Sequence, residues 1–88
     1  MNKERRAEIA KLAERIEALK GEFESIREEL ETVRDAESEY YDNMPESFQQ
    51  GEKGERAQAA VDALESAVSD LESCDLDSIL GYLETAGE

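Results

Sequence analysis

The feature that most constrains this chain is a heptad pattern in its N-terminal half. From Ile9 to Tyr40 the apolar residues recur in alternating steps of three and four, with Glu37 as the one interruption. This spacing places them along one stripe of an α-helix, as in coiled coils. The members of the stripe are Ile9, Leu12, Ile16, Leu19, Phe23, Ile26, Leu30, Val33 and Tyr40. The pattern therefore predicts one long helix over about residues 3–42.

The only proline of the chain ends this helix. Pro45 lacks the backbone N–H that a helix needs, and it restricts the residue before it. We therefore expect a turn over about residues 43–52. A second stripe with helical spacing follows it and predicts a helix over about residues 53–73. Its apolar members are Ala57, Val61, Leu64, Val68 and Leu71.

The apolar pattern changes phase after the second stripe. Leu76, Ile79, Leu80 and Leu83 share a helical face that does not continue the earlier one. Ser73 or Asp75 can cap the N-terminus of a new helix, because both residue types accept hydrogen bonds from free backbone N–H groups. We expect a short third helix over about residues 75–84.

These elements predict an all-α fold in a single helical domain, residues 1–88. Two long stripes joined by a turn form an antiparallel helical hairpin, packed like a coiled coil, with the short third helix at its C-terminal end. Two helices bury little apolar surface, so we expect the hairpin to associate with copies of itself into a helix bundle. The basic residues Lys11, Arg15 and Lys20 should lie beside the acidic stretch 75–84.

Charge and composition narrow the function classes. The chain has 24 acidic and 10 basic side chains, a formal net charge of −14. Such a charge disfavours direct binding of nucleic acid or an anionic membrane, and it favours a basic protein partner. There is no His, and the single Cys74 has no imidazole to activate it. We therefore predict that the protein is not an enzyme and uses no cofactor or metal.

The turn carries the one stretch that resembles known proteins. Residues 39–47 read EYYDNMPES, and GEKGER follows at residues 51–56. With the Leu-Glu repeats at Leu64 and Leu71, they resemble a group of small acidic proteins from phages and prophages. The resemblance implies a helical hairpin of viral origin, and it supplies no reaction and no ligand residues. With no signal peptide and no long apolar run, we expect the protein in the cytoplasm of a bacterial host cell.

Apolar side chains cluster at the turn. Tyr40, Tyr41, Met44 and Phe48 could form an exposed recognition tip, because Tyr and Met are frequent in interface cores. The alternative is that they cap the end of the hairpin core. We favour this second interpretation, with Tyr40 continuing the stripe and Phe48 folding back onto it.

The second candidate surface is acidic. No basic residue follows Arg56, and the candidate binding residues there are Asp62, Glu65, Asp70 and Glu72. One interpretation is that these carboxylates provide solubility and pair with the basic residues of the first helix. The other is that they imitate the charge of a nucleic-acid backbone and occupy a basic groove on a host protein.

These observations leave three functional hypotheses. The preferred one is a phage-type accessory or anti-defence protein that binds and inhibits a host protein. The second is a structural or scaffolding coiled-coil module. The third is an oligomeric sponge that sequesters a nucleotide signal between protomers, using Arg5, Arg6 or Arg27 with a tyrosine.

Overall fold

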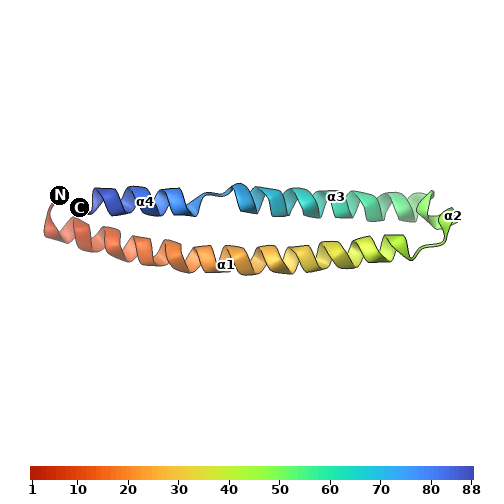
Figure 1. Cartoon of the computed structure of the whole chain (residues 1–88), viewed down its shortest axis with the longest axis horizontal. Helices are drawn as coiled ribbons and strands as arrows, with labels where there is room; N and C mark the ends of the chain where they lie inside the picture. Colours follow the sequence, from red (N-terminus) through yellow and green to blue (C-terminus); the bar gives the residue numbers. More distant parts are fainter. The chain divides into compact units, whose positions relative to one another are not determined.

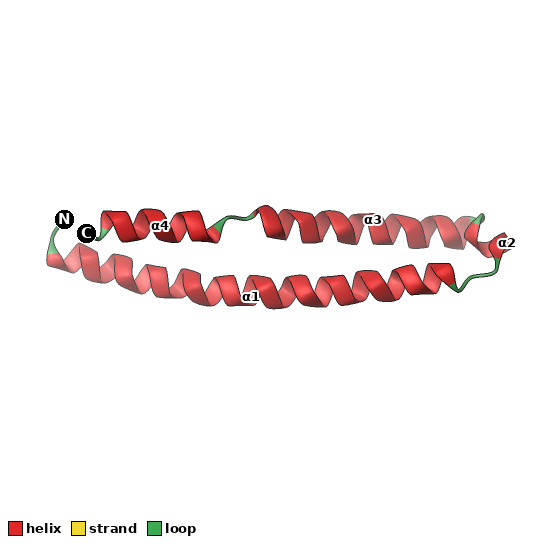
Figure 2. Cartoon of the chain, viewed as in Figure 1, coloured by secondary structure: helices red, strands yellow, loops and turns green.

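A computed structural model describes all 88 residues, and the chain consists of helices with no strand (Figure 2). The helices are α1 (Lys3–Asp42), α2 (Glu46–Gln49), α3 (Glu52–Ser73) and α4 (Leu76–Ala86), as labelled in Figure 1. The predicted all-α fold is confirmed. The residues group into two compact units that share α1. We call Ile26–Ser73 the turn unit, and Met1–Ser25 with Cys74–Glu88 the terminal unit.

The turn unit is a helical hairpin, in which the second half of α1 and α3 lie side by side and α2 forms the turn (Figure 1). Helix α1 closes with the N–H of Asn43 donating to the carbonyl of Glu39. Pro45 then precedes α2, where its missing N–H costs no hydrogen bond. The side-chain amide of Gln49 donates to the backbone oxygen of Tyr41 at 2.9 Å, which ties α2 to the end of α1.

Helices α2 and α3 approach each other closely at Gly54. This residue is buried, and a Cβ atom on it would lie 1.9 Å from the backbone oxygen of Gln49. No side-chain rearrangement can relieve an overlap with backbone. A glycine is therefore required for α3 to begin where it does.

The core of the turn unit is thin. Only Ala57 and Val68, 2% and 5% exposed, are buried apolar residues, and no large side chain of the chain is fully buried. The other inward residues of α3, Val61, Leu64 and Leu71, are half-buried. Small residues bring the two helices close together, but they remove little apolar surface from water.

The face that α1 turns toward α3 is rotated from the stripe seen in the sequence. Leu30 is half-buried as expected, but Arg27 and Arg34 are also half-buried, and Ile26 and Val33 remain exposed. Aliphatic stems of arginine cover apolar surface while the guanidinium group reaches a carboxylate. One half of the stripe thus faces α3, and the other half is left uncovered in the single chain.

The terminal unit pairs the first half of α1 with α4. Asp75 is the N-cap of α4: its carboxylate accepts the backbone N–H of Ser78 at 3.0 Å and the Ser78 hydroxyl at 2.6 Å. Of the three basic residues expected near α4, Lys20 forms an ion pair with Asp77 at 2.7 Å. Lys11 and Arg15 are exposed and form no ion pair.

The inward faces of the terminal unit repeat the pattern of the turn unit. Ile9, Ala13 and Ile16 of α1 are half-buried, as are Leu80 and Leu83 of α4. The exposed large apolar side chains here are Met1, Leu12, Leu19, Ile79 and Tyr82. No helix of the chain combines the length and the apolar character needed to cross a membrane.

Candidate functional site

Acidic side chains lie on both sides of the seam between the two helices of the turn unit. Arg27 and Arg34 emerge along this seam, and the Nη1 atom of Arg27 lies 3.5 Å from a carboxylate oxygen of Glu72. The hydrogen bond from Arg34 to Asp35 raises the pKa of the guanidinium group, and the charges of Glu31 and Glu65 raise it further. We define Glu31, Glu65 and Glu72 as the acidic border of the turn unit.

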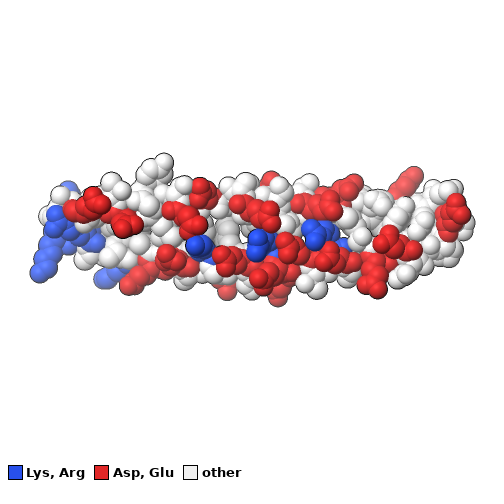
Figure 3. Space-filling view, viewed as in Figure 1, with Lys and Arg blue, Asp and Glu red and all other residues white.

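The terminal unit has a matching arrangement around a single lysine. The hydrogen bond to Asp77 and its charge raise the pKa of Lys20, and the charges of Glu17 and Glu24 contribute in the same direction. We define Glu17, Glu24 and Asp77 as the acidic border of the terminal unit. Figure 3 shows one face of the molecule, on which acidic side chains are spread along the helices, a few basic side chains lie between them, and further basic side chains gather at the end that holds the N-terminus. Lys20, Arg27 and Arg34 are thus engaged by carboxylates of the same chain, and the groups beside them that face outward are carboxylates.

The four acidic residues singled out from the sequence do not form one surface. All four are exposed, but only Glu65 and Glu72 belong to the acidic border of the turn unit. At 100° per residue, Asp62 and Asp70 lie on the outer side of α3, away from its inward residues. This division provides matched carboxylates of the same helix for comparison in experiments.

The apolar cluster at the turn forms an open hollow of about 220 Å³ rather than a closed cap. Tyr40 and Phe48 are 52% and 51% exposed, and the expected packing of these two rings onto the core is therefore wrong. Tyr41 and Met44 are half-buried instead. Tyr41 is half-buried in place of Tyr40 because it is Tyr41 that continues the rotated inward face of α1.

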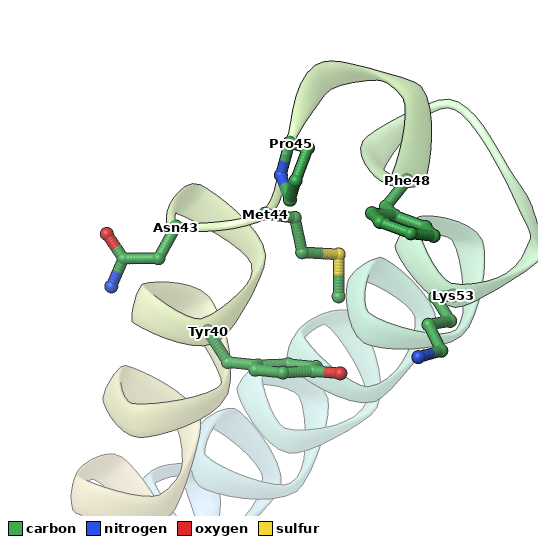
Figure 4. A pocket seen from close by; sticks show the side chains of 6 residues that line it. All are labelled: Tyr40, Asn43, Met44, Pro45, Phe48 and Lys53. Carbon is green, nitrogen blue, oxygen red and sulfur yellow. The ribbon is translucent and has the colours of Figure 1, made fainter.

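Figure 4 shows the lining of this hollow. The Met44 side chain lies between Tyr40 and Phe48, Pro45 lies beside it, and Asn43 points away. The ammonium group of Lys53 stands 5.6 Å from the centre of the Phe48 ring, within cation–π range. The hollow is wide open and holds no buried polar group, so it offers shape but little to orient a small ligand.

A second hollow, of about 420 Å³, lies between α1 and α4 in the terminal unit. Its apolar wall includes Ile9 and Leu83, and the one cation on its rim is Arg6. Glu14, Glu17 and Glu84 stand around the same rim. Three carboxylates near one guanidinium group repel an anion, so this hollow does not suit a nucleotide phosphate.

Sequence reasoning missed the role of Arg27 and Arg34. With Lys20 they recur every seven residues, and this regular basic spacing is the signal that could have identified them. The remaining reactive group, the Cys74 thiol, is free and exposed. The chain has no group of three or more His, Cys, Asp or Glu side chains placed to hold a metal ion.

Comparisons with known proteins give no relative. No family model matches the chain, and no curated protein or solved structure is significantly similar to it.

Proposed function

We propose that this chain is a phage-type accessory protein without catalytic activity, which binds a basic surface of a host protein and inhibits it. The observation that carries the proposal is the pair of acidic borders. In both units, carboxylates flank the helix seam, while Lys20 and Arg27 are paired with acidic side chains of the opposite helix. The surface offered to a partner is therefore strongly anionic and rests on helices.

The spacing of these carboxylates supports imitation of a nucleic-acid backbone. Glu24, Glu28 and Glu31 follow one another on α1 at steps of four and three residues. At a rise of 1.5 Å per residue, these steps are about 6 and 4.5 Å along the helix axis. Phosphates of one strand follow at about 3.4 Å along the duplex axis, so the linear charge densities are of the same order. A basic groove in a bacterial nucleic-acid-binding protein is the partner that this surface fits best.

A structural or scaffolding role is the second candidate, and the exposed leucines favour it. Leu12 and Leu19 remain nearly half exposed in the single chain. The nucleotide sponge has less support, because Arg27 is engaged by Glu72 and Arg6 stands among carboxylates. A scaffold would work through its apolar side chains, and an inhibitor of the proposed kind through its carboxylates.

Two charge-matched variants separate these functions. The border variant carries Glu17→Gln, Glu24→Gln, Glu31→Gln and Glu65→Gln. The control variant carries Glu14→Gln, Glu55→Gln, Asp62→Asn and Asp70→Asn, at residues that are exposed and form no ion pair. Both variants lose four negative charges, so they differ in where charge is removed and not in how much.

Each chain is immobilised, exposed to bacterial lysate at low salt, and then eluted with a short DNA duplex. We expect the wild-type and control columns to retain proteins that the duplex displaces, and the border column to lose them. Equal loss from both variants would indicate a bulk charge effect. Equal retention, or no protein that the duplex displaces, would refute the proposed function. Circular dichroism of each variant confirms that the helices are intact.

A further inference from the structure

Helix α1 carries a row of exposed apolar side chains that no other part of the chain covers. The row recurs every seven residues, and its members are between 41% and 55% exposed. We call it the apolar row; it consists of Leu12, Leu19, Ile26, Val33 and Tyr40. Isolated exposed apolar residues are common on proteins, but a regular row along one helix is typical of an interface.

The second helix of each unit extends this apolar surface. On α1 the row lies three residues after the inward residues Ile9, Ile16, Phe23 and Leu30. In the turn unit, Ala60 and Ala67 likewise stand three residues after the inward Ala57 and Leu64, and in the terminal unit Ile79 stands three residues after Leu76. In an antiparallel helix pair, positions with the same offset lie on the same side of the pair. Each unit therefore has an apolar face, formed by both of its helices, and the acidic border lies on the opposite face of the helix pair.

The accessible surface of the chain is large for its mass. It measures 6646 Å² for 9.9 kDa, whereas a compact monomeric protein of this mass exposes about 5,200 Å². The difference, about 1,400 Å², exceeds the roughly 800 Å² that each partner buries in a stable interface of ordinary size. The single chain thus buries few apolar side chains, and its additional accessible surface is large enough to form an interface with one partner.

We propose that a second copy of this chain packs on the apolar row, with the two α1 helices antiparallel. The charge distribution selects this direction. Residues 35–52 carry six acidic and no basic side chains, whereas residues 1–20 carry six basic and four acidic ones. A parallel pair would place the two acidic turns together, while an antiparallel pair places each turn beside the basic start of the partner's α1. Opposite charges across an interface fix its register and suppress the competing alignment.

This arrangement has a two-fold axis close to Ile26, the middle member of the apolar row. Leu12 then lies opposite Tyr40 of the other copy, and Leu19 lies opposite Val33. The acidic borders stay outside the interface, so the dimer exposes two copies of the turn-unit border and two copies of the terminal-unit border. The inference is independent of the proposed function, because it rests on the apolar face of each unit.

Single-cysteine variants test both the pairing and its direction. Cys74→Ser removes the native thiol, and Leu12→Cys and Tyr40→Cys are then made separately in that background. The two chains are mixed, unfolded, refolded together and oxidised. The antiparallel pair predicts a disulfide between the two different chains in the mixture and none in either variant alone. A parallel pair would instead give efficient disulfides within each variant alone.

A control and a second measurement keep the result unambiguous. Ser66→Cys lies on the outer side of α3, and it should give no dimer under the same conditions. Sedimentation equilibrium of the unmodified chain should give twice the monomer mass at micromolar concentration. A monomer at that concentration, or disulfides within the separate Leu12→Cys and Tyr40→Cys samples, would overturn the proposal.

Discussion

Replacing Gly54 with alanine should destabilise the turn unit, although alanine is the better helix former. A Cβ atom at this position would lie 1.9 Å from the backbone oxygen and 2.4 Å from the carbonyl carbon of Gln49. Ordinary contact begins near 3.4 Å, so α2 must move away from α3 by more than an ångström. That movement also strains the 2.9 Å hydrogen bond from Gln49 to Tyr41.

Overpacking of this kind costs about 1–3 kcal/mol or more, and loss of the hydrogen bond adds about 1 kcal/mol. The higher helix propensity of alanine offsets about 1 kcal/mol of this loss in the free energy of unfolding. We therefore expect Gly54→Ala to lower the free energy of unfolding by about 1–3 kcal/mol. Gly21→Ala is the matched control: nothing lies within 4 Å of its Cβ position, so it should raise that free energy by about 1 kcal/mol. Urea denaturation followed by circular dichroism, at one fixed chain concentration, measures both. Equal stabilisation by the two changes would refute the close approach of α2 and α3.

Three further changes probe other parts of the chain. Arg27→Leu should raise the free energy of unfolding by about 1 kcal/mol in the same urea assay, because the buried Nε atom of Arg27 has no hydrogen-bond partner; a loss of stability would show that its ion pair matters more. Hydrogen bonds from Ser78 lower the pKa of Asp75 in the folded chain. The stabilisation by this cap is therefore complete above the pKa that Asp75 has in the unfolded chain, and it is lost as the pH falls through the lower pKa of the folded chain. NMR should show the start of α4 fraying in acid, and Asp75→Asn should remove this pH dependence; an unchanged acid transition would contradict the assignment. Ile26→Asp should dissociate the proposed pair in sedimentation experiments, because it buries an unpaired charge; an intact dimer would place the interface elsewhere.

The helices and their approximate ends follow from local signals in the sequence. Heptad spacing, one proline and a capping aspartate each act within a few residues, so they indicate helix and turn whatever the tertiary packing. Asp75, one of two candidate caps, is the N-cap of α4. No such local signal indicates that residue 54 must be glycine, because the requirement comes from the backbone of Gln49 in a neighbouring helix.

The orientation of α1 could not be predicted from its own apolar pattern. The stripe is about two rows wide, and the small residues of α3, such as Ala57, leave room for only one of them beside the stems of Arg27 and Arg34. The inward row carries Arg27, whose partner Glu72 lies on the other helix and is not indicated by the pattern of α1. The same rotation exposes Tyr40, which helical periodicity alone had placed in the core.

The central claim is that the acidic borders, rather than the total charge, bind the partner. The most direct measurement is the affinity of one protein captured on the wild-type column for the wild-type, border and control chains over a series of salt concentrations. Each ion pair formed in the complex adds to the slope of log Kd against log salt. The account predicts a smaller slope and weaker binding for the border variant, with the control variant equal to wild type. Identical slopes for the border and control variants would contradict it.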